Sequence, residues 1–399
     1  MKKRKIVVLV GDGMGDYPVA ELGGKTPLQA ARIPHIRRLA AAGDLRMVQT
    51  VPESGLSPGS DVANLGLLGY KPEDHYTGRA PIEAAGAGIP LGSDDVAFRC
   101  NLVTVADGRM DDYSAGHITT EEGRQLVASV EQTMGRPGLR FHGGVSYRHL
   151  LVWKDGPAGI KTQPPHDIAG KPVADNLPAG EQQDAVRSLM EQSIALFRDH
   201  PVNKARVAAG KKPATQIWLW GQGRSLKLPT YRELYGLTGG VITAVDLIRG
   251  LGRLIGLEVI DVPGATGFLD TNYAGKVQAA LDVIDRHGFV FVHIEAPDEC
   301  GHMGKAALKV EAIEAFDQKV VAPVWAALEK KGDPYRLLLC TDHRTPVSKR
   351  GHTREPVPMI SLDGPVGAVS RETAFDEFSC GGKASGTVYE RMRELLRTA

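Results

Sequence analysis

The sequence predicts an α/β fold with a central, mainly parallel sheet, into which a smaller α+β domain is inserted. Three apolar, β-branched runs support the parallel sheet: KIVVLV precedes Asp12, FVFVHI precedes Glu295 and YRLLLC precedes Asp342. Runs of this kind are typical of strands that are buried on both faces of a parallel sheet. Segments with helical periodicity separate them, and this alternation indicates a layered α/β domain. The helical segments are TPLQAARIPHIRRLAAAG, TAVDLIRGLGRLIG and AALKVEAIEAFDQKVVAPVWAALEKKG.

The insertion is expected over residues 94–228, because this stretch contributes none of the strands that end in acids. It contains three short strand candidates, a proline-rich loop and one long helical pattern: AFRCNLVTV, SYRHLLVW, TQIWLWG, KTQPPHDIAGKPV and EQQDAVRSLMEQSIALFRDH. Residues 1–93 and 229–399 would then form one discontinuous main domain.

The composition is that of an ordinary globular protein and excludes several classes of function. The 399 residues include 48 basic and 47 acidic ones, so no global field directs the chain toward nucleic acid or membranes. The cysteines are far apart, which argues against a disulfide framework and a thiolate zinc site, and fits a reducing cytoplasm. The apolar run near the N-terminus is only as long as a strand, so we interpret it as β-structure and not as a signal peptide.

The segment GDGMGD, residues 11–16, follows the first predicted strand and resembles a dinucleotide fingerprint. That fingerprint would need glycine at position 16, where the chain has Asp16. Asp12 directly after a strand instead suits a hard cation, since functional residues gather beyond the carboxyl ends of parallel strands. A simpler alternative is that Asp12 caps a tight glycine-rich turn.

The segment SPGSDVANLGLLGY, residues 57–70, places Ser60 after a Pro-Gly turn and at the start of an apolar helix. Serine at such a position is commonly just an N-cap. A helix N-terminus also favours a phosphate, and a hydroxyl bound to a divalent cation there could act as a nucleophile.

Two further segments carry carboxylates and imidazoles at ligand-like spacing. Asp298 and His302 are four residues apart, so a helical turn after the strand would direct both side chains the same way, although a helix cap is the alternative. Asp342 and His343 can bind one cation only if the strand before them has ended, and His352 follows in a glycine-flanked loop. Carboxylate and imidazole ligands without thiolate suit Mn²⁺ or Zn²⁺. His293 alternates within a strand, which favours a hydrogen-bonded core histidine.

Taken together, these motifs resemble the alkaline phosphatase superfamily, and within it the archaeal type of cofactor-independent phosphoglycerate mutase. The resemblance runs over essentially the whole chain and rests on VGDGMGD, PGSDVANLGLLGY, VPGATGFLDTNY, EAPDECGH, the Asp-His pair and the later Gly-His-Thr. It implies a glycolytic isomerase that passes the phosphate of 3-phosphoglycerate through a phosphoserine to give 2-phosphoglycerate.

The resemblance also implies the site residues. Ser60 would be the nucleophile, and two cations would be held by Asp12, Ser60, Asp342 and His343 and by Asp298, His302 and His352. Mn²⁺ is the expected metal, with Zn²⁺, Co²⁺ and Mg²⁺ as alternatives. The insertion would close over the substrate and exclude water, because water that reached the phosphoserine would make the enzyme a phosphatase. The candidates for gripping the glycerate carboxylate are Arg99, Asp111, His117, Arg148, His149 and Arg224.

One departure from the archaeal pattern bears on the substrate. Trp220 stands where the archaeal members carry an arginine, so if that arginine holds substrate, this chain has either lost the contact or moved the task to Arg224. A homoserine kinase with the same metals is the alternative function, but the chain has neither a Walker loop nor a kinase-type glycine-rich loop. A non-catalytic protein on a decayed phosphatase fold ranks last, because all seven ligand candidates are present.

Overall fold

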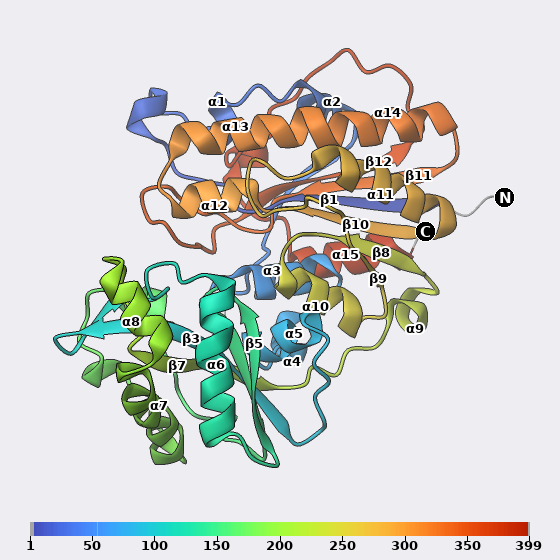
Figure 1. Ribbon diagram of the computed structural model, residues 1–399. Helices are drawn as coiled ribbons and strands as arrows, with labels where there is room; N and C mark the ends of the chain where they lie inside the picture. The colour runs from blue at the N-terminus through green and yellow to red at the C-terminus, as the bar shows by residue number, and fades with distance from the viewer. Residues whose placement is uncertain (1–3, 54, 398–399) are drawn as a thin grey trace. The chain divides into compact units, whose positions relative to one another are not determined.

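The computed structural model describes residues 4–53 and 55–397 (Figure 1). The chain forms two compact units, one made of residues 1–76 and 227–399 and the other of residues 77–226. We call them the main unit and the inserted unit and describe each by itself. Among the described residues, no helix is both long enough and apolar enough to cross a bilayer.

The main unit is built on a seven-stranded sheet in the order β2-β12-β11-β1-β10-β8-β9. Strands β11, β1, β10, β8 and β9 are parallel to one another. At one edge β12 pairs antiparallel with β11, and β2 pairs antiparallel with β12. The prediction of a mainly parallel sheet is therefore confirmed. The strand bounds are β1 Lys5–Gly11, β2 Asp44–Val48, β8 Gly239–Ile242, β9 Glu258–Ile260, β10 Phe289–Ile294, β11 Tyr335–Cys340 and β12 Val357–Gly364.

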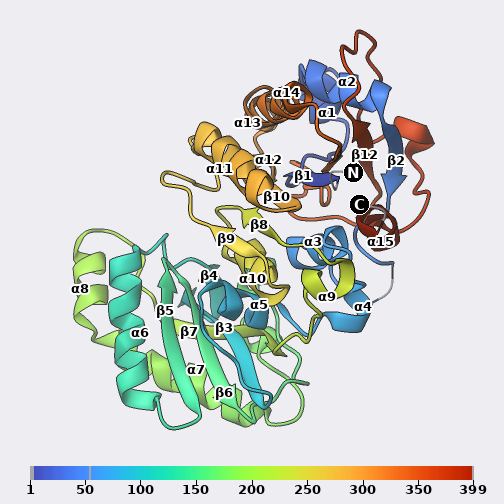
Figure 2. The same ribbon diagram turned by 90° about the vertical axis from the view of Figure 1, so that its right-hand side faces the viewer.

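Helices cover both faces of this sheet, as Figures 1 and 2 show. The first face packs against α1 (Pro27–Ala30), α2 (Pro34–Ala42), α11 (Tyr273–Arg286), α13 (Ala306–Phe316) and α14 (Ala322–Lys331), whose apolar side chains form one core with the central strands. The other face carries α3 (Ser60–Leu67), α10 (Asp246–Leu254) and α15 (Val388–Arg397). The three runs that end in acids are buried on both sides for this reason.

The long helical pattern after residue 305 forms α13 and α14 joined by one π-helical segment, η4 (Asp317–Val321). Pro323 explains the widening, because proline lacks the N–H of a regular helical bond and its ring crowds the preceding turn. The remaining elements of the main unit are η1 (Ala20–Leu22), α4 (Pro72–His75), α9 (Tyr231–Tyr235), α12 (Ala296–His302) and η5 (Ser379–Gly382).

The inserted unit is α+β, as predicted, with an antiparallel sheet in the order β4-β3-β6-β5 and with β7 also paired to β3. Its strands are β3 Asp95–Ala106, β4 Arg109–Asp112, β5 Leu139–Val145, β6 Arg148–Lys154 and β7 Gln216–Arg224. Helices α6 (Thr120–Met134), α7 (Gln183–Arg198) and α8 (Pro201–Ala208) share one core with this sheet. Two 3₁₀ turns, η2 (Pro165–Ile168) and η3 (Ala174–Asn176), lie in the proline-rich stretch.

The expected start of the insertion at residue 94 is wrong by 17 residues, because the second unit begins at Thr77. Helix α5 (Arg79–Gly86) belongs to the inserted unit, since its Ala80 and Ala84 pack against Ala97 of β3 and Leu150 of β6. This helix is short and rich in alanine, and nothing in its sequence marks it as part of the insertion. At the other end the unit stops at Leu226, close to the expected residue 228.

Candidate metal centre

The ends of three parallel strands and the start of one helix bring acidic, imidazole and hydroxyl groups together within the main unit. Asp12 follows β1, α12 follows β10, and the Asp342-His343 pair follows β11. Ser60 is the first residue of α3. The candidate residues on these segments span positions 12 to 352 of the sequence, and the three strand ends meet because the carboxyl ends of adjacent parallel strands lie at the same edge of a sheet.

The first group of candidate ligands consists of Asp12, Ser60, Asp342 and His343. His343 Nε2 lies 3.1 Å from Ser60 Oγ and 3.4 Å from both Asp12 Oδ1 and Asp342 Oδ2. The ligand atoms of the two aspartates and the histidine all lie within 4.8 Å of one another, and these three side chains are fully buried. Strand β11 ends at Cys340, so both residues of the Asp-His pair can face one cation.

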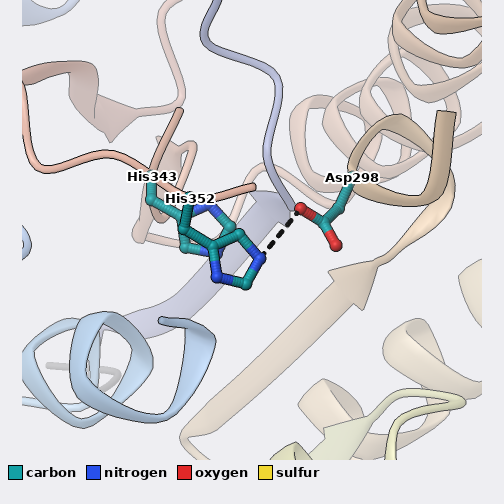
Figure 3. Close-up of side chains that lie close together, drawn as sticks. All are labelled: Asp298, His343 and His352. Atoms are coloured by element: carbon teal, nitrogen blue, oxygen red, sulfur yellow. Dashed lines mark ion pairs between the residues drawn. The ribbon is translucent and has the colours of Figure 1, made fainter. Parts of the chain in front are cut away.

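The second group consists of Asp298, His302 and His352. Asp298 Oδ2 lies 3.1 Å from His302 Nε2. Asp298 Oδ1 lies 3.5 Å from His352 Nε2, the ion pair that Figure 3 marks. The two imidazole Nε2 atoms are 3.0 Å apart. His343 also reaches this group, because its ligand atom lies within 4.8 Å of those of Asp298 and His352. The structure therefore joins all seven predicted residues in one contiguous cluster.

Local structure explains how α12 presents its two candidate ligands. Asp298 and His302 are four residues apart on this helix, so their side chains lie on one face. Asp298 Oδ1 accepts a 2.5 Å hydrogen bond from Thr345 Oγ1, and His302 Nδ1 lies 3.0 Å from Arg350 O. Such partners fix the orientation of side chains that bind metals.

Gly13 permits the loop after β1 to approach this helix. Its φ is +61°, and a Cβ there would lie 2.6 Å from Asp298 Oδ1 and 2.5 Å from Thr345 Oγ1. Only glycine avoids both the left-handed strain and this collision. The Gly13 N–H donates to Asp342 Oδ1 at 3.0 Å, which connects the loop after β1 with the Asp-His pair after β11.

Asn64 orients residues of the first group, but sequence reasoning did not identify it. Its Nδ2 donates to Asp342 Oδ2 at 2.8 Å and to Ser60 O at 2.9 Å, and the side chain is fully buried. The signal was present, since Asn64 follows Ser60 by four residues and hence lies on the same face of α3.

The buried carboxylates of the cluster form a site that favours a bound cation. Burial, together with Asp342 and Glu295, raises the pKa of Asp12 well above its usual value, and neither of its oxygens accepts a well-formed hydrogen bond from the described residues. Burial acts in the same direction on Asp298, but hydrogen bonds from His302 and His352 outweigh it and hold the pKa of that carboxyl well below normal. Buried carboxylates without cationic partners are costly. The acid and imidazole clusters are consistent with divalent metal binding.

A third group, Asp12, His293 and Glu295, adjoins the first. His293 is buried in β10 as expected, but the expected hydrogen bond is not found, since neither ring nitrogen has a well-formed partner among the described residues. Its Nε2 lies 3.1 Å from Asp12 Oδ2 and its Nδ1 lies 3.8 Å from Glu295 Oε2. Burial lowers the pKa of His293 to about 4 and raises that of Glu295 to about 8. The buried ammonium of Lys276, on α11, supplies a positive charge that acts on both. Sequence reasoning did not identify Lys276 or the role of Glu295.

The inserted unit contains a separate cluster of arginines around one carboxylate. Arg99 Nε lies 2.9 Å from Glu83 Oε2, and Arg79 Nε lies 2.8 Å from Glu83 Oε1. The charge of Arg148 also acts on Glu83. Burial opposes the ionisation of Glu83, but Arg99 and Arg79 outweigh it and lower the pKa of this carboxyl. The cluster therefore carries more positive than negative charge.

Trp220 forms one wall of this arginine cluster. Its ring lies 4.3 Å from the Arg99 guanidinium carbon, and its Nε1 donates to Asn101 Oδ1 at 3.1 Å. Arg99 and Arg148 were among the predicted substrate-binding residues, whereas Arg79 and Glu83 were not. They lie on α5, which had been placed outside the insertion.

The other predicted residues of the inserted unit lie apart from the arginine cluster or make local contacts. Asp111 is exposed and pairs with Lys212 at 2.9 Å, and His117 is exposed. His149 is 2% exposed and its Nδ1 accepts from Gly144 N at 2.9 Å, which favours a core role. Arg224 is exposed at the end of β7.

Comparison with protein families and curated proteins identifies full-length relatives. The family model described as 2,3-bisphosphoglycerate-independent phosphoglycerate mutase matches residues 40–203. The enzyme of that name from Methanothrix thermoacetophila is 51% identical over 384 residues, which cover 96% of this chain and 97% of the relative. A protein from Geobacter sulfurreducens named as a probable member is 48% identical and covers 98% of this chain and 99% of its own.

Two solved structures share the fold over the whole chain. The PH0037 protein of Pyrococcus horikoshii has a TM-score of 0.81 and 28% identity, and covers 100% of this chain and 99% of its own. A cofactor-independent phosphoglycerate mutase from Thermoplasma acidophilum has a TM-score of 0.62 and 27% identity, and covers 99% of this chain and 100% of its own.

Proposed function

The chain belongs to the family of 2,3-bisphosphoglycerate-independent phosphoglycerate mutases, and from this premise we propose that it interconverts 3-phosphoglycerate and 2-phosphoglycerate through a phosphoserine at Ser60. The observation that carries the proposal is the position of Ser60. Its hydroxyl lies at the N-terminus of α3, 3.1 Å from His343 Nε2 and within the cluster of seven candidate ligands. Free N–H groups at a helix N-terminus favour a phosphate there.

Two divalent cations fit the donor set. Asp12, Ser60, Asp342 and His343 would hold one, and Asp298, His302 and His352 the other, with Mn²⁺ proposed and Zn²⁺, Co²⁺ and Mg²⁺ as alternatives. When bound, the cations would lower the pKa of the Ser60 hydroxyl and neutralise charge on the phosphoryl oxygens. The mixture of carboxylates and imidazoles without thiolate supports this assignment.

The proposed reaction consists of two phosphoryl transfers. Ser60 Oγ forms a bond to phosphorus while the bond from phosphorus to the C3 oxygen breaks, and the serine proton ends on that released oxygen. Glycerate stays bound, and its 2-hydroxyl oxygen next forms a bond to phosphorus while the bond from phosphorus to Ser60 Oγ breaks. The proton of the 2-hydroxyl ends on Ser60 Oγ. Asn64 holds the start of α3 and Asp342 in register throughout, because it donates to both.

The inserted unit is proposed to bind the glycerate and exclude water during the transfer. The arginine cluster of Arg79, Arg99 and Arg148 supports this role, since a guanidinium fork suits carboxylate and phosphate oxygens. Trp220 would keep the Arg99 plane fixed by stacking. In Arg99→Lys we expect kcat/KM to fall at least tenfold while Mn²⁺ affinity is unchanged. Unchanged kcat/KM would remove Arg99 from the proposed substrate site.

A coupled assay tests the mutase activity. Purified protein with Mn²⁺ and 3-phosphoglycerate, coupled to enolase without ATP or bisphosphoglycerate, should yield phosphoenolpyruvate. Ser60→Ala should lower the rate at least a thousandfold, whereas Ser188→Ala, at an exposed serine of α7, should leave it unchanged. A parallel reaction with ATP and homoserine should yield no phosphohomoserine. The mutase proposal would be contradicted if that reaction yielded phosphohomoserine while the coupled assay yielded no phosphoenolpyruvate.

A further inference from the structure

A buried ion pair lies behind the metal centre. Lys309, on α13, and Asp16, in the loop after β1, are 0% and 1% exposed, and Lys309 Nζ lies 2.8 Å from Asp16 Oδ2. Neither residue belongs to the candidate ligand set. A lysine ammonium is seldom fully buried unless it is paired, so this position requires an explanation.

The Lys309 ammonium also joins two loops that carry candidate ligands. Besides Asp16, its Nζ donates to Gly15 O and to Thr345 O, each at 2.8 Å. All three donors of the ammonium are therefore used. Gly15 O accepts a further hydrogen bond from Thr345 N at 3.0 Å, so the two loops are also linked directly.

Asp16 makes further hydrogen bonds between the same two loops. Val347 N lies 3.2 Å from both of its carboxylate oxygens, and Tyr17 N donates to Oδ1 at 2.8 Å. The Asp16 N–H donates to Glu377 Oε1 at 2.7 Å. The acid that excludes a dinucleotide fingerprint in GDGMGD thus ties the loop after β1 to the loop after β11.

These contacts link three segments that carry candidate ligands. Gly15 and Asp16 follow Asp12 in one loop, and Thr345 follows His343 in another. Thr345 Oγ1 donates to Asp298 Oδ1, and Lys309 itself lies on the helix that follows α12. We propose that Lys309 and Asp16 are positioning residues that hold the three ligand-bearing segments at the spacing that metal binding requires. The proposal rests on the metal centre and not on the identity of the substrate.

The charge pattern distinguishes positioning from simple stabilisation. A buried ion pair often contributes little to stability, because desolvation of both charges offsets their attraction. Removal of one partner leaves an unpaired buried charge, whereas removal of both charges relieves that penalty. Stability should therefore recover in a double variant, while the lost connection between the loops should not.

The experiment uses Lys309→Met, Asp16→Asn and the double variant, all prepared without metal. We expect Lys309→Met to weaken Mn²⁺ binding at least tenfold in calorimetric titration and to lower the Tm of the metal-free protein. In the double variant the Tm should return toward that of the wild type, with Mn²⁺ binding still weakened at least tenfold. The double variant also serves as the test if Lys309→Met alone does not fold.

Arg336→Met is the matched control in the same unit. Arg336 is 6% exposed, pairs with Asp363 at 2.6 Å and lies near the start of β11, away from the end that carries the ligands. This control should lower the Tm without a change in Mn²⁺ affinity.

Wild-type Mn²⁺ affinity in the double variant would overturn the proposal and leave a structural ion pair. A wild-type protein that binds no Mn²⁺ would overturn the metal centre and this proposal with it. Mn²⁺ binding that responds as expected in a protein without mutase activity would support the positioning role and contradict only the proposed substrate.

Discussion

At the residue scale, the Asn64 side chain contacts both Asp342 and the residue that carries the proposed nucleophile. It donates to Asp342 Oδ2 and to the backbone of Ser60 with one amide group. Partners that orient metal ligands contribute about tenfold to a hundredfold in affinity or activity. We expect Asn64→Ala to lower kcat and Mn²⁺ affinity by about that factor.

The control for Asn64→Ala is Asn203→Ala in the inserted unit. Asn203 is also buried, and its Nδ2 donates to Phe197 O and Ala214 O, so its loss removes the same kind of contact. It should lower the Tm and leave kcat unchanged. Equal losses of kcat in the two variants would show that Asn64 acts through stability alone.

His149 gives a pH prediction at the same scale. Burial lowers the pKa of His149 to about 4, below the value of about 6.5 in the unfolded chain. Between these two values the unfolded state binds the extra proton, so acidification from pH 6.5 to pH 4 destabilises the folded state. The shift corresponds to about 3 kcal/mol at pH 4.

His149→Gln, which cannot titrate in this range, should remove that part of the pH dependence. Denaturant unfolding of wild type and variant from pH 7 to pH 4 measures the difference. Parallel curves for the two proteins would contradict the buried neutral state of His149. The control is His142→Gln at a half-buried position on the neighbouring strand, which should retain most of the pH dependence.

At the residue scale, sequence reasoning identified side chains whose neighbours in the chain form a motif and missed those whose partners lie elsewhere. Asp298 and His302 could be recognised from their spacing of four. Lys276 and Lys309 have no such signal, because each lies on the face of an ordinary helix and acquires its partners only through the fold.

At the scale of elements, the close approach of α12 to the loop after β11 positions the second group of candidate ligands. Gly301 lies in this helix, and a Cβ there would lie 2.5 Å from Thr345 O. Alanine is the better helix former by about 1 kcal/mol, but it would push the helix away from the loop. We expect Gly301→Ala to weaken Mn²⁺ binding at least tenfold in calorimetric titration.

Gly123→Ala in α6 is the matched control, because its Cβ would lie 2.4 Å from Ser146 O in the inserted unit. It should lower stability and leave Mn²⁺ affinity unchanged. Tight Mn²⁺ binding by Gly301→Ala would show that the helix can shift without moving its ligands.

The elements were predictable to different degrees for physical reasons. The strands of the parallel sheet are buried on both faces, so their continuous apolar runs and their acidic ends stand out in the sequence. Helix α5 is short and packs through small alanine side chains, which gives only a weak pattern. The start of the inserted unit was misplaced for that reason.

At the scale of the whole molecule, all seven candidate ligands lie in the main unit. The proposed Mn²⁺ sites exist only in the folded state, so binding should stabilise that unit by RT ln(1 + [L]/Kd), about 2.7 kcal/mol per site at a hundredfold excess over Kd. Calorimetry of protein treated with a chelator should show the unfolding of the main unit move to higher temperature when Mn²⁺ is added. The inserted unit should be unaffected, and an equal shift for both units would contradict the placement of the site.

The phosphoserine at Ser60 is the central claim, and mass spectrometry tests it most directly. Metal-loaded protein is mixed with 3-phosphoglycerate alone, quenched with acid during turnover and digested, and the peptides and phosphoglycerates are measured in the same samples. The account predicts phosphate on the peptide that contains Ser60 together with newly formed 2-phosphoglycerate. Formation of 2-phosphoglycerate with phosphate on another residue, or with none on Ser60, would contradict it.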